Sequence, residues 1–432
     1  MSNRELHYVM VLPVAAYPLG QSRFAVESAF AEHLRLLLAM HKPRFSSLTL
    51  AGPVMPSSVY QQRGSYLTEL DADEDHIRFV GLYDADANDP AMARHLPEAM
   101  RRMRAVVEDA DLVLSGASDN LKRPFEFYSL MLASKLGKKT IGVTDIDLRE
   151  EARMLRETGR WSRRTYLSNR WVYNPARVWQ QRRLVEKCSL VLLKGQKLVE
   201  DYGNGSDHVK FFQDTAYSTE QIISQAELTR RCEDVERSAE PLKLVHFGRL
   251  EFYKGIHHAI EALALANGAD EDTQIAQLSI IGTGSEEEAL RELADARGVS
   301  DAVQFLPPMS YGDELLAGIR AQDLMIAPAL APDTPRSAWD AIASGVPILA
   351  YDTEYYAQLG EETGAVATVP WGDVQALADA IATLAKDRPR IARMKRDSRA
   401  SALQNSQERW LARRIAWTEA LFSEEHVIPK DE

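Results

Sequence analysis

Short apolar runs alternate with segments of helical periodicity along the first half of the chain. The apolar runs predict buried strands, and apolar residues recurring every three or four positions predict helices between them. The expected helices are 21–40, 97–109 and 125–136. The expected strands are 7–14, 47–54, 77–82, 111–115, 139–145, 190–194 and 208–212. This alternation is typical of βαβ units, so it predicts an α/β fold with a mostly parallel sheet covered on both faces.

A second series of the same kind begins at Leu242. Before it, residues 218–240 are polar, charged and helical without a core-facing signal, so we interpret them as a linker. The expected helices of the second series are 257–266, 286–297, 311–321 and 338–344. Its expected strands are 242–247, 277–281, 303–306, 324–327, 346–350 and 364–369. The pattern therefore predicts two Rossmann-like halves in tandem, followed by a helix at 406–422 whose apolar residues dock on another surface.

Length and composition narrow the class of protein. A chain of 432 residues is too long for one typical core. The net charge of −12 argues against a general nucleic-acid binder, although a local basic patch remains compatible with it. No apolar run approaches the roughly 20 residues that span a bilayer, and the N-terminus resembles a strand more than a signal peptide. Two cysteines exclude a disulfide framework and a cysteine zinc site, so we expect a cytoplasmic protein.

The stretch 331–352 predicts a loop, a helix and a buried strand. Asp333 or Thr334 is expected to cap the helix, with Pro335 at its first position and Gly345 just beyond its end. A helix start with free backbone N–H groups suits an anionic ligand such as phosphate. The alternative is an ordinary αβ unit of a parallel sheet.

Two further strand ends carry candidate chemistry. The sequence FGRLEFYKG at 247–255 places Gly248, Arg249 and Lys254 after the first strand of the second half, where two cations could bind a diphosphate. The alternative is two solvated cations in a turn. The sequence IIGTG brings Gly282 and Gly284 to the next strand end, either near a phosphate or in a simple tight turn.

Taken in order, the motifs GRLxxxKG, GxG, VxFLPP, DxxIAP and AIASGVPILA resemble the nucleotide-binding half of retaining GT-B glycosyltransferases, the sucrose-synthase-like and mannosyltransferase-like enzymes. The resemblance is strong over 242–352. It implies two Rossmann-like domains that face a central cleft, with the C-terminal helix crossing back to the first domain. The implied division is an acceptor domain at 1–216, a donor domain at 217–404 and a returning helix at 405–432.

The resemblance also implies residue roles. Arg249 and Lys254 would bind the diphosphate of a nucleoside-diphosphate sugar and stabilise the leaving group. Asp340 would hold the ribose, and the backbone around Pro308 and Met309 would contact the base. The nucleotide sugar is a substrate, and neither a cofactor nor a metal is expected.

This chain departs from the family where the donor sugar is recognised. The first acidic residue of the family's pair should lie eight positions before Asp340, but Pro332 stands there and Asp333 follows it. Asp333 would take over the contact with the donor sugar. Alternatively, recognition is rebuilt around Thr334, Arg336 and Ser337, or activity is lost.

The first half offers candidates for the acceptor side. Gly20 lies in a loop that is expected to precede a helix and to face the donor phosphates, unless the loop is a plain βα turn. Asp145 and Asp147 end a strand near the expected acceptor position, where a carboxylate could orient a hydroxyl or accept its proton. The alternative is that they cap the following helix.

Residues 149–187 hold ten arginines among several Trp and Tyr residues. Trp161, Arg163, Arg164 and Trp171 would bind an anionic lipid-linked acceptor or the anionic inner face of the membrane. Two alternatives also fit this composition: stacking on nucleic acid, and a surface helix pair that faces an acidic partner. We do not expect nucleic acid to be a partner of this protein.

The expected function is retaining transfer of a sugar to a glycan or lipid-linked acceptor in surface polysaccharide synthesis. The alternatives are a catalytically inactive nucleotide-sugar-binding subunit and a phosphorylase or epimerase of the same fold.

Overall fold

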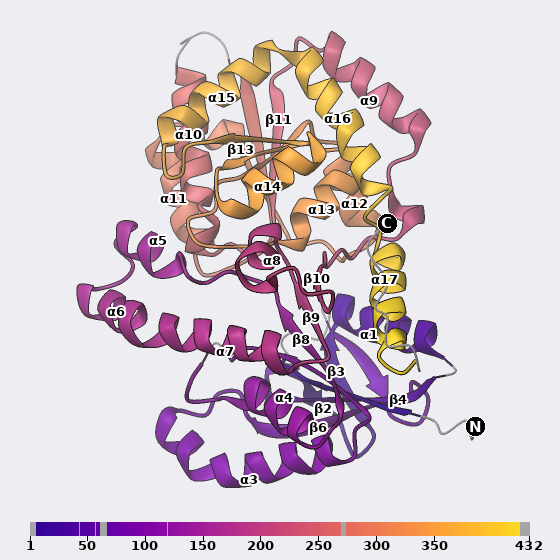
Figure 1. Ribbon diagram of the computed structural model, residues 1–432. Coiled ribbons are helices and arrows are strands. Elements are labelled where there is room, and N and C mark those ends of the chain that lie inside the picture. Colours follow the sequence, from indigo (N-terminus) through magenta and orange to yellow (C-terminus); the bar gives the residue numbers. More distant parts are fainter. Residues whose placement is uncertain are drawn as a thin grey trace. The chain divides into compact units, whose positions relative to one another are not determined.

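The computed structural model describes residues 6–42, 44–56, 58–60, 67–118, 120–268 and 274–423. The chain forms two compact units (Figure 1). Unit 1 contains Met1–Asp145, Leu167–Phe212 and Trp410–Glu432. Unit 2 contains Ile146–Tyr166 and Gln213–Arg409. The division differs from the expected boundary at residue 216, because the segment Ile146–Tyr166 groups with unit 2.

Unit 1 is built on a parallel sheet with helices on both faces, as the sequence pattern predicts. In spatial order its strands are β10 (Val209–Phe211), β9 (Leu190–Leu193), β8 (Lys139–Thr144), β7 (Leu112–Gly116), β1 (Leu6–Val11), β4 (Phe45–Val54) and β6 (Ile77–Asp84). Its larger helices are α1 (Ser28–His41), α3 (Asp89–Glu108), α4 (Phe125–Lys135), α7 (Asn174–Lys187), α8 (Gln196–Gly203) and α17 (Gln407–Ala420). From α17, Trp410, Leu411 and Ile415 pack into the same core as Tyr8 and Phe45.

The predicted helix at 21–40 is wrong over residues 21–27, because helix α1 begins only at Ser28. Residues Arg23–Glu27 form strand β3, which pairs antiparallel with β2 (Tyr17–Pro18) and β5 (Leu67–Asp71). The apolar residues of this segment suit a strand and a helix equally, and tertiary pairing decides between them because β-propensity depends on context. Gly20 consequently lies in a hairpin turn at a φ of +152°, not in a turn that enters a helix. The structural premise for its phosphate role is therefore wrong.

Unit 2 contains a second parallel sheet, also enclosed by helices (Figure 1). In spatial order its strands are β13 (Val303–Leu306), β12 (Ala276–Ile281), β11 (Leu242–Phe247), β14 (Leu324–Ala327), β15 (Ile348–Tyr351) and β16 (Val366–Val369). Its helices include α5 (Glu151–Glu157), α9 (Gln225–Arg237), α10 (Ile256–Gly268), α11 (Glu287–Ala296), α12 (Asp313–Arg320), α13 (Arg336–Ala343), α14 (Glu354–Thr363), α15 (Val374–Lys386) and α16 (Arg388–Ala402).

The segment 218–240 is part of the second core, so interpreting it as a linker without core contacts was wrong. Leu228, Cys232 and Val235 of α9 are buried. Their spacing places them on one face of the helix. The Cys232 thiol donates to the Ala392 carbonyl of α16 at 3.5 Å. The apolar stripe of this helix is narrow and lies among many charged residues, so the sequence pattern did not predict it.

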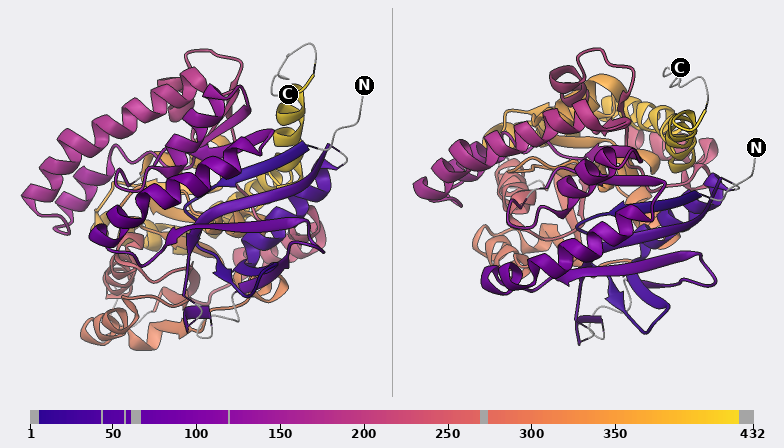
Figure 2. Two further views of the ribbon diagram at one scale, coloured as in Figure 1. Left: turned by 90° about the horizontal axis from the view of Figure 1, so that it is seen from below. Right: turned by 60° about the horizontal axis from the view of Figure 1, so that its bottom comes forward.

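Within the arginine- and tryptophan-rich segment 149–187, the short helix α5 is followed by one long helical rod. It consists of α6 (Arg163–Ser168), the π-helical turn η2 (Asn169–Tyr173) and α7 in direct succession. Both views of Figure 2 show it as a continuous magenta helix.

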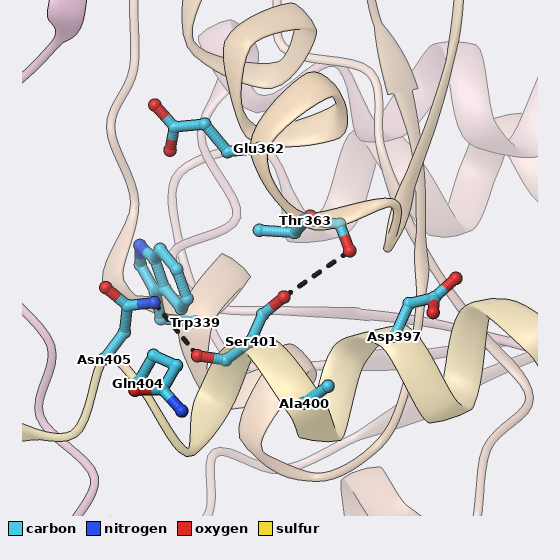
Figure 3. Close-up of a pocket in the computed structure, with 8 residues that line it drawn as sticks. All are labelled: Trp339, Glu362, Thr363, Asp397, Ala400, Ser401, Gln404 and Asn405. Carbon is cyan, nitrogen blue, oxygen red and sulfur yellow. Dashed lines mark hydrogen bonds between the residues drawn. The ribbon is translucent and has the colours of Figure 1, made fainter.

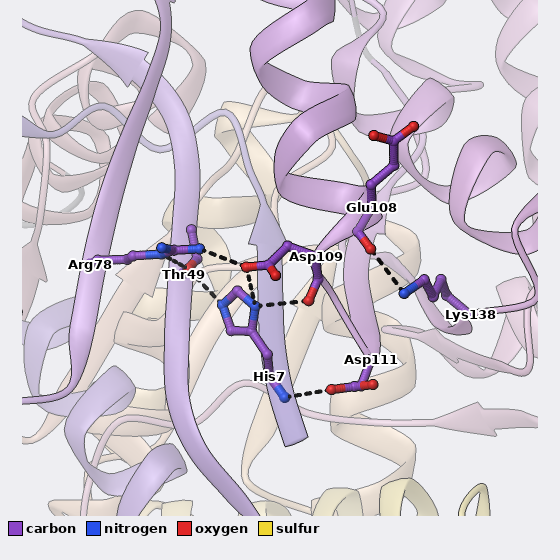
Figure 4. Close-up of polar contacts among 7 residues, drawn as sticks. All are labelled: His7, Thr49, Arg78, Glu108, Asp109, Asp111 and Lys138. Carbon is purple, nitrogen blue, oxygen red and sulfur yellow. Dashed lines mark hydrogen bonds and ion pairs between the residues drawn. The ribbon is translucent and has the colours of Figure 1, made fainter. Parts of the chain in front are cut away.

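A polar network joins the N-terminal ends of the unit 1 strands (Figure 4). His7 Nε2 lies 2.8 Å from the Thr49 hydroxyl, and its Nδ1 lies 3.2 Å from the Asp109 carbonyl. Arg78 donates to the same hydroxyl at 2.6 Å and pairs with the Asp109 carboxylate at 3.2 Å. The His–Thr pair has no place in catalysis, because Thr49 is fully buried and ligands of such sheets bind at the opposite, carboxyl-terminal edge.

Candidate active site

The loops that follow β11 and β12 pack backbone against backbone. The Gly248 N–H donates to the Ile281 carbonyl and the Leu250 N–H donates to Thr283, both at 3.0 Å. A Cβ on Gly282 would lie 1.9 Å from the Gly248 carbonyl oxygen, at a φ of +144°. A Cβ on Gly284 would lie 2.3 Å from the Leu250 carbonyl oxygen. The structure therefore supports a packing role for Gly282 and Gly284, which was the alternative to direct phosphate contact.

The FGRLEFYKG turn presents its two cations in different environments. Arg249 is exposed and donates to the Tyr253 hydroxyl at 2.8 Å. The next residues form the 3-10 turn η4 (Phe252–Lys254), which ends at Gly255 in the left-handed region. A Cβ on Gly255 would meet the Pro328 carbonyl oxygen at 1.8 Å, so only glycine fits where this turn leans on the end of β14.

Lys254 forms an ion pair with Asp333, in which the Nζ to Oδ2 distance is 2.5 Å. The two side chains are only 14% and 13% exposed. This pair joins the turn after β11 to the loop before α13, and so unites two of the predicted site segments. The acidic residue that meets the lysine is Asp333, one position after the Pro332 that replaces the family carboxylate.

The predicted capping of α13 by Asp333 or Thr334 is wrong. Pro335 occupies the N-cap position, where it makes no side-chain capping hydrogen bond, and the first helical residue is Arg336. Asp333 lies too far from the helix start to cap it, and its carboxylate turns to Lys254 instead. Thr334, Arg336 and Ser337 lie beside it, all partly buried.

Asp340 is buried on α13, with 4% of its surface exposed. Its carboxylate accepts a hydrogen bond from the Tyr311 hydroxyl at 3.1 Å. Burial raises the pKa of Asp340 to about 7, while Tyr311 and Arg336 oppose this rise. Pro308 and Met309 lie in the loop between β13 and α12 that also carries Tyr311. The contact of Asp340 in this structure is thus a tyrosine from the predicted base-binding loop.

Tyr311 and Tyr355 are two site residues that the sequence reasoning missed. Tyr355 follows strand β15, and burial together with the charge of Asp333 raises the pKa of its hydroxyl. The available signal was the aromatic pair in YDTEYY directly after a predicted strand, because ligands lie beyond the carboxyl ends of parallel strands.

Asp147 accepts hydrogen bonds from the Arg149 backbone N–H at 3.0 Å and from the Arg149 Nε at 2.8 Å. It closes the turn that precedes α5, and it belongs to unit 2, whereas Asp145 is the last residue of the first unit 1 segment. Neither the geometry of Asp145 nor that of Asp147 tests the acceptor role, which stays a prediction.

The long helix exposes cations and aromatic rings together. Arg163 and Arg164 are exposed, and Trp161 is half-buried. Trp171 is 70% exposed and Trp179 is 56% exposed, unusual values for such large apolar side chains. None of the helices that the structure describes is long and apolar enough to cross a bilayer.

A cavity of about 300 Å3 lies where α13, α14 and α16 meet (Figure 3). Its lining residues are Trp339, Glu362, Thr363, Asp397, Ala400, Ser401, Gln404 and Asn405. The Ser401 hydroxyl donates to the Thr363 carbonyl at 3.4 Å, and the Asn405 amide donates to the Ser401 carbonyl at 2.9 Å. Among the described residues, none of those predicted for the site lines this cavity, so it is separate from the Lys254–Asp333 pair.

Both units are Rossmann-like, and in unit 2 the cations Arg249 and Lys254 follow a strand at the carboxyl-terminal edge of the sheet. Residues 232–401 match the family "Glycosyl transferases group 1". The matched residues lie within unit 2 and include the stretch 242–352, in which the ordered motifs resemble this family.

Known proteins show how far the similarity extends. The chain is 32% identical over 193 residues to a D-inositol 3-phosphate glycosyltransferase of Corynebacterium urealyticum, covering 42% of each protein. It is 32% identical over 152 residues to a glycogen synthase of Mycobacterium tuberculosis, covering 34% of each. The matched part thus spans well under half the length of these relatives. The crystal structure of Anabaena HepE in complex with UDP superposes with a TM-score of 0.62 at 16% identity, covering 96% of this chain and 99% of that one. This likeness confirms the GT-B fold over both units.

Proposed function

We propose that the protein is a retaining glycosyltransferase that moves a sugar from a nucleoside-diphosphate sugar to a glycan or lipid-linked acceptor in surface polysaccharide synthesis. The observation that carries the proposal is the Lys254–Asp333 pair beside the exposed Arg249, at the strand edge of a group 1 domain. The UDP-bound structure of HepE supports a nucleotide donor.

In this proposal Arg249 and Lys254 hold the diphosphate and stabilise the charge that develops as the sugar–phosphate bond breaks. Lys254 would share its ammonium group between Asp333 and the β-phosphate. The Asp333 carboxylate would then accept a hydrogen bond from a hydroxyl of the donor sugar. The acceptor attacks from the face that the leaving group occupies, and no metal or cofactor takes part.

The acceptor side of the proposal rests on the segment after β8. Asp147, held by Arg149, would orient the acceptor hydroxyl. The exposed Trp171 and Trp179, with Arg163 and Arg164, would contact an anionic acceptor lipid or the membrane surface that carries it.

The test is a panel of UDP-, GDP- and ADP-sugars. We expect one of them to raise the melting temperature and to be hydrolysed slowly or transferred, with release of the nucleoside diphosphate. If no nucleotide sugar raises the melting temperature or is turned over, the transferase proposal is wrong.

One observation favours a second function. Lys254 is already neutralised by Asp333, so the site could bind a nucleotide sugar weakly and without chemistry, as an inactive subunit would. A phosphorylase or epimerase of the same fold is the other alternative. Binding without turnover in the presence of candidate acceptors would favour the inactive subunit, and phosphate-dependent turnover or sugar isomerisation would favour the other two.

A further inference from the structure

The segment Ile146–Tyr166 leaves unit 1 after β8, joins unit 2 and returns to unit 1 within the α6 helix. Arg160, three residues after the end of α5, provides its most specific contacts. The guanidinium group lies 3.6 Å from the centroid of the Phe252 ring, and Nη2 lies 3.3 Å from the Glu286 carboxylate. A planar guanidinium group can stack on a ring and form an ion pair at once, which a lysine ammonium group does less well.

Phe252 is the first residue of the turn η4, and Lys254 is the last. The Phe252 ring also stacks on His257, with a centroid distance of 4.9 Å and an interplanar angle of 21°. Phe252 is therefore in contact with both Arg160 and His257. Burial, His258 and Arg160 lower the pKa of His257 to about 4, so His257 is neutral at pH 7 and does not repel the guanidinium group.

A second contact fixes the start of the same turn. The Ser285 hydroxyl donates to the Glu251 carboxylate at 2.8 Å. Glu251 directly precedes Phe252, and Ser285 directly precedes Glu286. Arg160 thus connects the two loops that follow β11 and β12, and it does so from a segment that is flanked in the sequence by unit 1 residues on both sides. The side chain of Arg160 is 46% exposed, so burial of apolar surface does not explain these contacts.

We propose that Arg160 is a positioning residue, which docks the Ile146–Tyr166 segment on Phe252 and Glu286 and thereby holds Lys254 in its diphosphate-binding position. This inference rests on the proposed donor role of Lys254. Because Asp147 lies on the same segment, the docked state also brings the predicted acceptor carboxylate to the unit that binds the donor.

The experiment compares Arg160→Ala with Arg153→Ala in the full-length protein. Arg153 is an exposed arginine of α5 that pairs only with Glu150 and Glu157 among the described residues, so it is a matched control. Binding of a nucleoside diphosphate and of the monophosphate of the same base is measured by calorimetry. We expect Arg160→Ala to weaken diphosphate binding roughly three- to tenfold, to leave monophosphate binding unchanged, and Arg160→Lys to recover part of the loss. Arg153→Ala should change neither.

If Arg160→Ala weakens binding of the diphosphate and of the monophosphate equally, Arg160 has a general structural role and the inference is overturned. An unchanged diphosphate affinity in Arg160→Ala would also overturn it. A wild-type protein that binds no nucleoside diphosphate would instead contradict the proposed function.

A second experiment measures docking of the segment directly. The variants Phe252→Leu and Glu286→Gln keep every arginine of the segment, so the rate of trypsin cleavage between residues 149 and 164 can be compared with that of the wild type. We expect faster cleavage in both variants than in the wild type, and equal rates would show that these contacts do not dock the segment.

Discussion

Lys254 and Asp333 illustrate how one displaced carboxylate can alter a site. Their ion pair is largely shielded from water, so it is stronger than a surface pair. The lysine therefore offers a diphosphate less net charge than an unpaired lysine would. Under the proposed function, Asp333 would therefore have two opposing effects: it would weaken diphosphate binding, and it would accept a hydrogen bond from the donor sugar.

Asp333→Asn separates these two effects. We expect the variant to bind a nucleoside diphosphate roughly three- to tenfold more tightly, because Lys254 loses its counter-charge. We expect turnover of the nucleotide sugar to fall by about tenfold or more, because the charged acceptor for the sugar hydroxyl is lost. Calorimetry and a diphosphate-release assay measure the two quantities. Glu292→Gln, an exposed carboxylate of α11, is the control, and unchanged turnover in Asp333→Asn would exclude the sugar contact.

Asp340 predicts a specific pH dependence of stability. Its pKa is about 7 in the folded protein and roughly 3.9 in an unfolded chain. Between these values the folded state binds the proton more strongly, so the contribution of Asp340 to stability falls as the pH rises from about 4 to 7. Asp340→Asn cannot ionise and still accepts a hydrogen bond from Tyr311. We expect its melting temperature, relative to the wild type, to increase from pH 5 to pH 8, whereas a constant difference would contradict the raised pKa.

At the scale of elements, the strands of unit 2 were the most predictable part of the fold. The expected ranges 242–247, 303–306 and 324–327 coincide with β11, β13 and β14. Each is a short apolar run whose neighbours break regular structure. The strand β3 and the buried stripe of α9 were missed because their identity depends on partners distant in sequence, namely β5 and α16.

The same reason limits prediction of the site. Sequence motifs predicted a site at Arg249, Lys254 and the 332–337 loop. They did not predict the ion pair of Lys254, because its partner lies 79 residues away and depends on where α13 begins. The roles of Gly282 and Gly284 could not be decided either, because a glycine motif does not say whether a phosphate or a neighbouring carbonyl requires it.

Gly282→Ala tests the packing role of that glycine. The added methyl group would collide with the Gly248 carbonyl oxygen, and the φ of +144° is unfavourable for alanine. We expect the free energy of unfolding to fall by about 2–3 kcal/mol, measured by urea denaturation. Gly268→Ala, where no atom lies within 4 Å of the new Cβ, is the control. If the two variants have the same free energy of unfolding, the loops after β11 and β12 can move apart to accept a methyl group, and the packing role of Gly282 is wrong.

At the scale of the whole molecule, the charge of −12 opposes binding to anionic membranes. The α6–η2–α7 helix must overcome this repulsion locally if it contacts lipid. We expect the protein to co-sediment with vesicles that contain anionic lipid. This binding should weaken as the salt concentration rises from about 0.1 to about 0.5 M, because salt shortens the distance over which charges attract. Trp171→Ala should reduce binding severalfold, whereas Leu265→Ala, an exposed apolar residue of α10, should not. Equal binding to neutral vesicles would contradict an electrostatic contact.

The chain passes between its two units at residues 145–146, 166–167, 212–213 and 409–410. A single recombination point therefore cannot exchange the whole of unit 2 for the corresponding part of a relative. A chimera joined near residue 213 would keep the native Arg160 but would receive the turn that contacts it from the other protein. The Arg160 contacts would then form only if the incoming sequence carries an aromatic residue at position 252 and an acidic residue at position 286. Descendants that acquire a new donor specificity by exchange of halves would have to replace the short 146–166 segment as well, so the two halves of this protein are expected to evolve together.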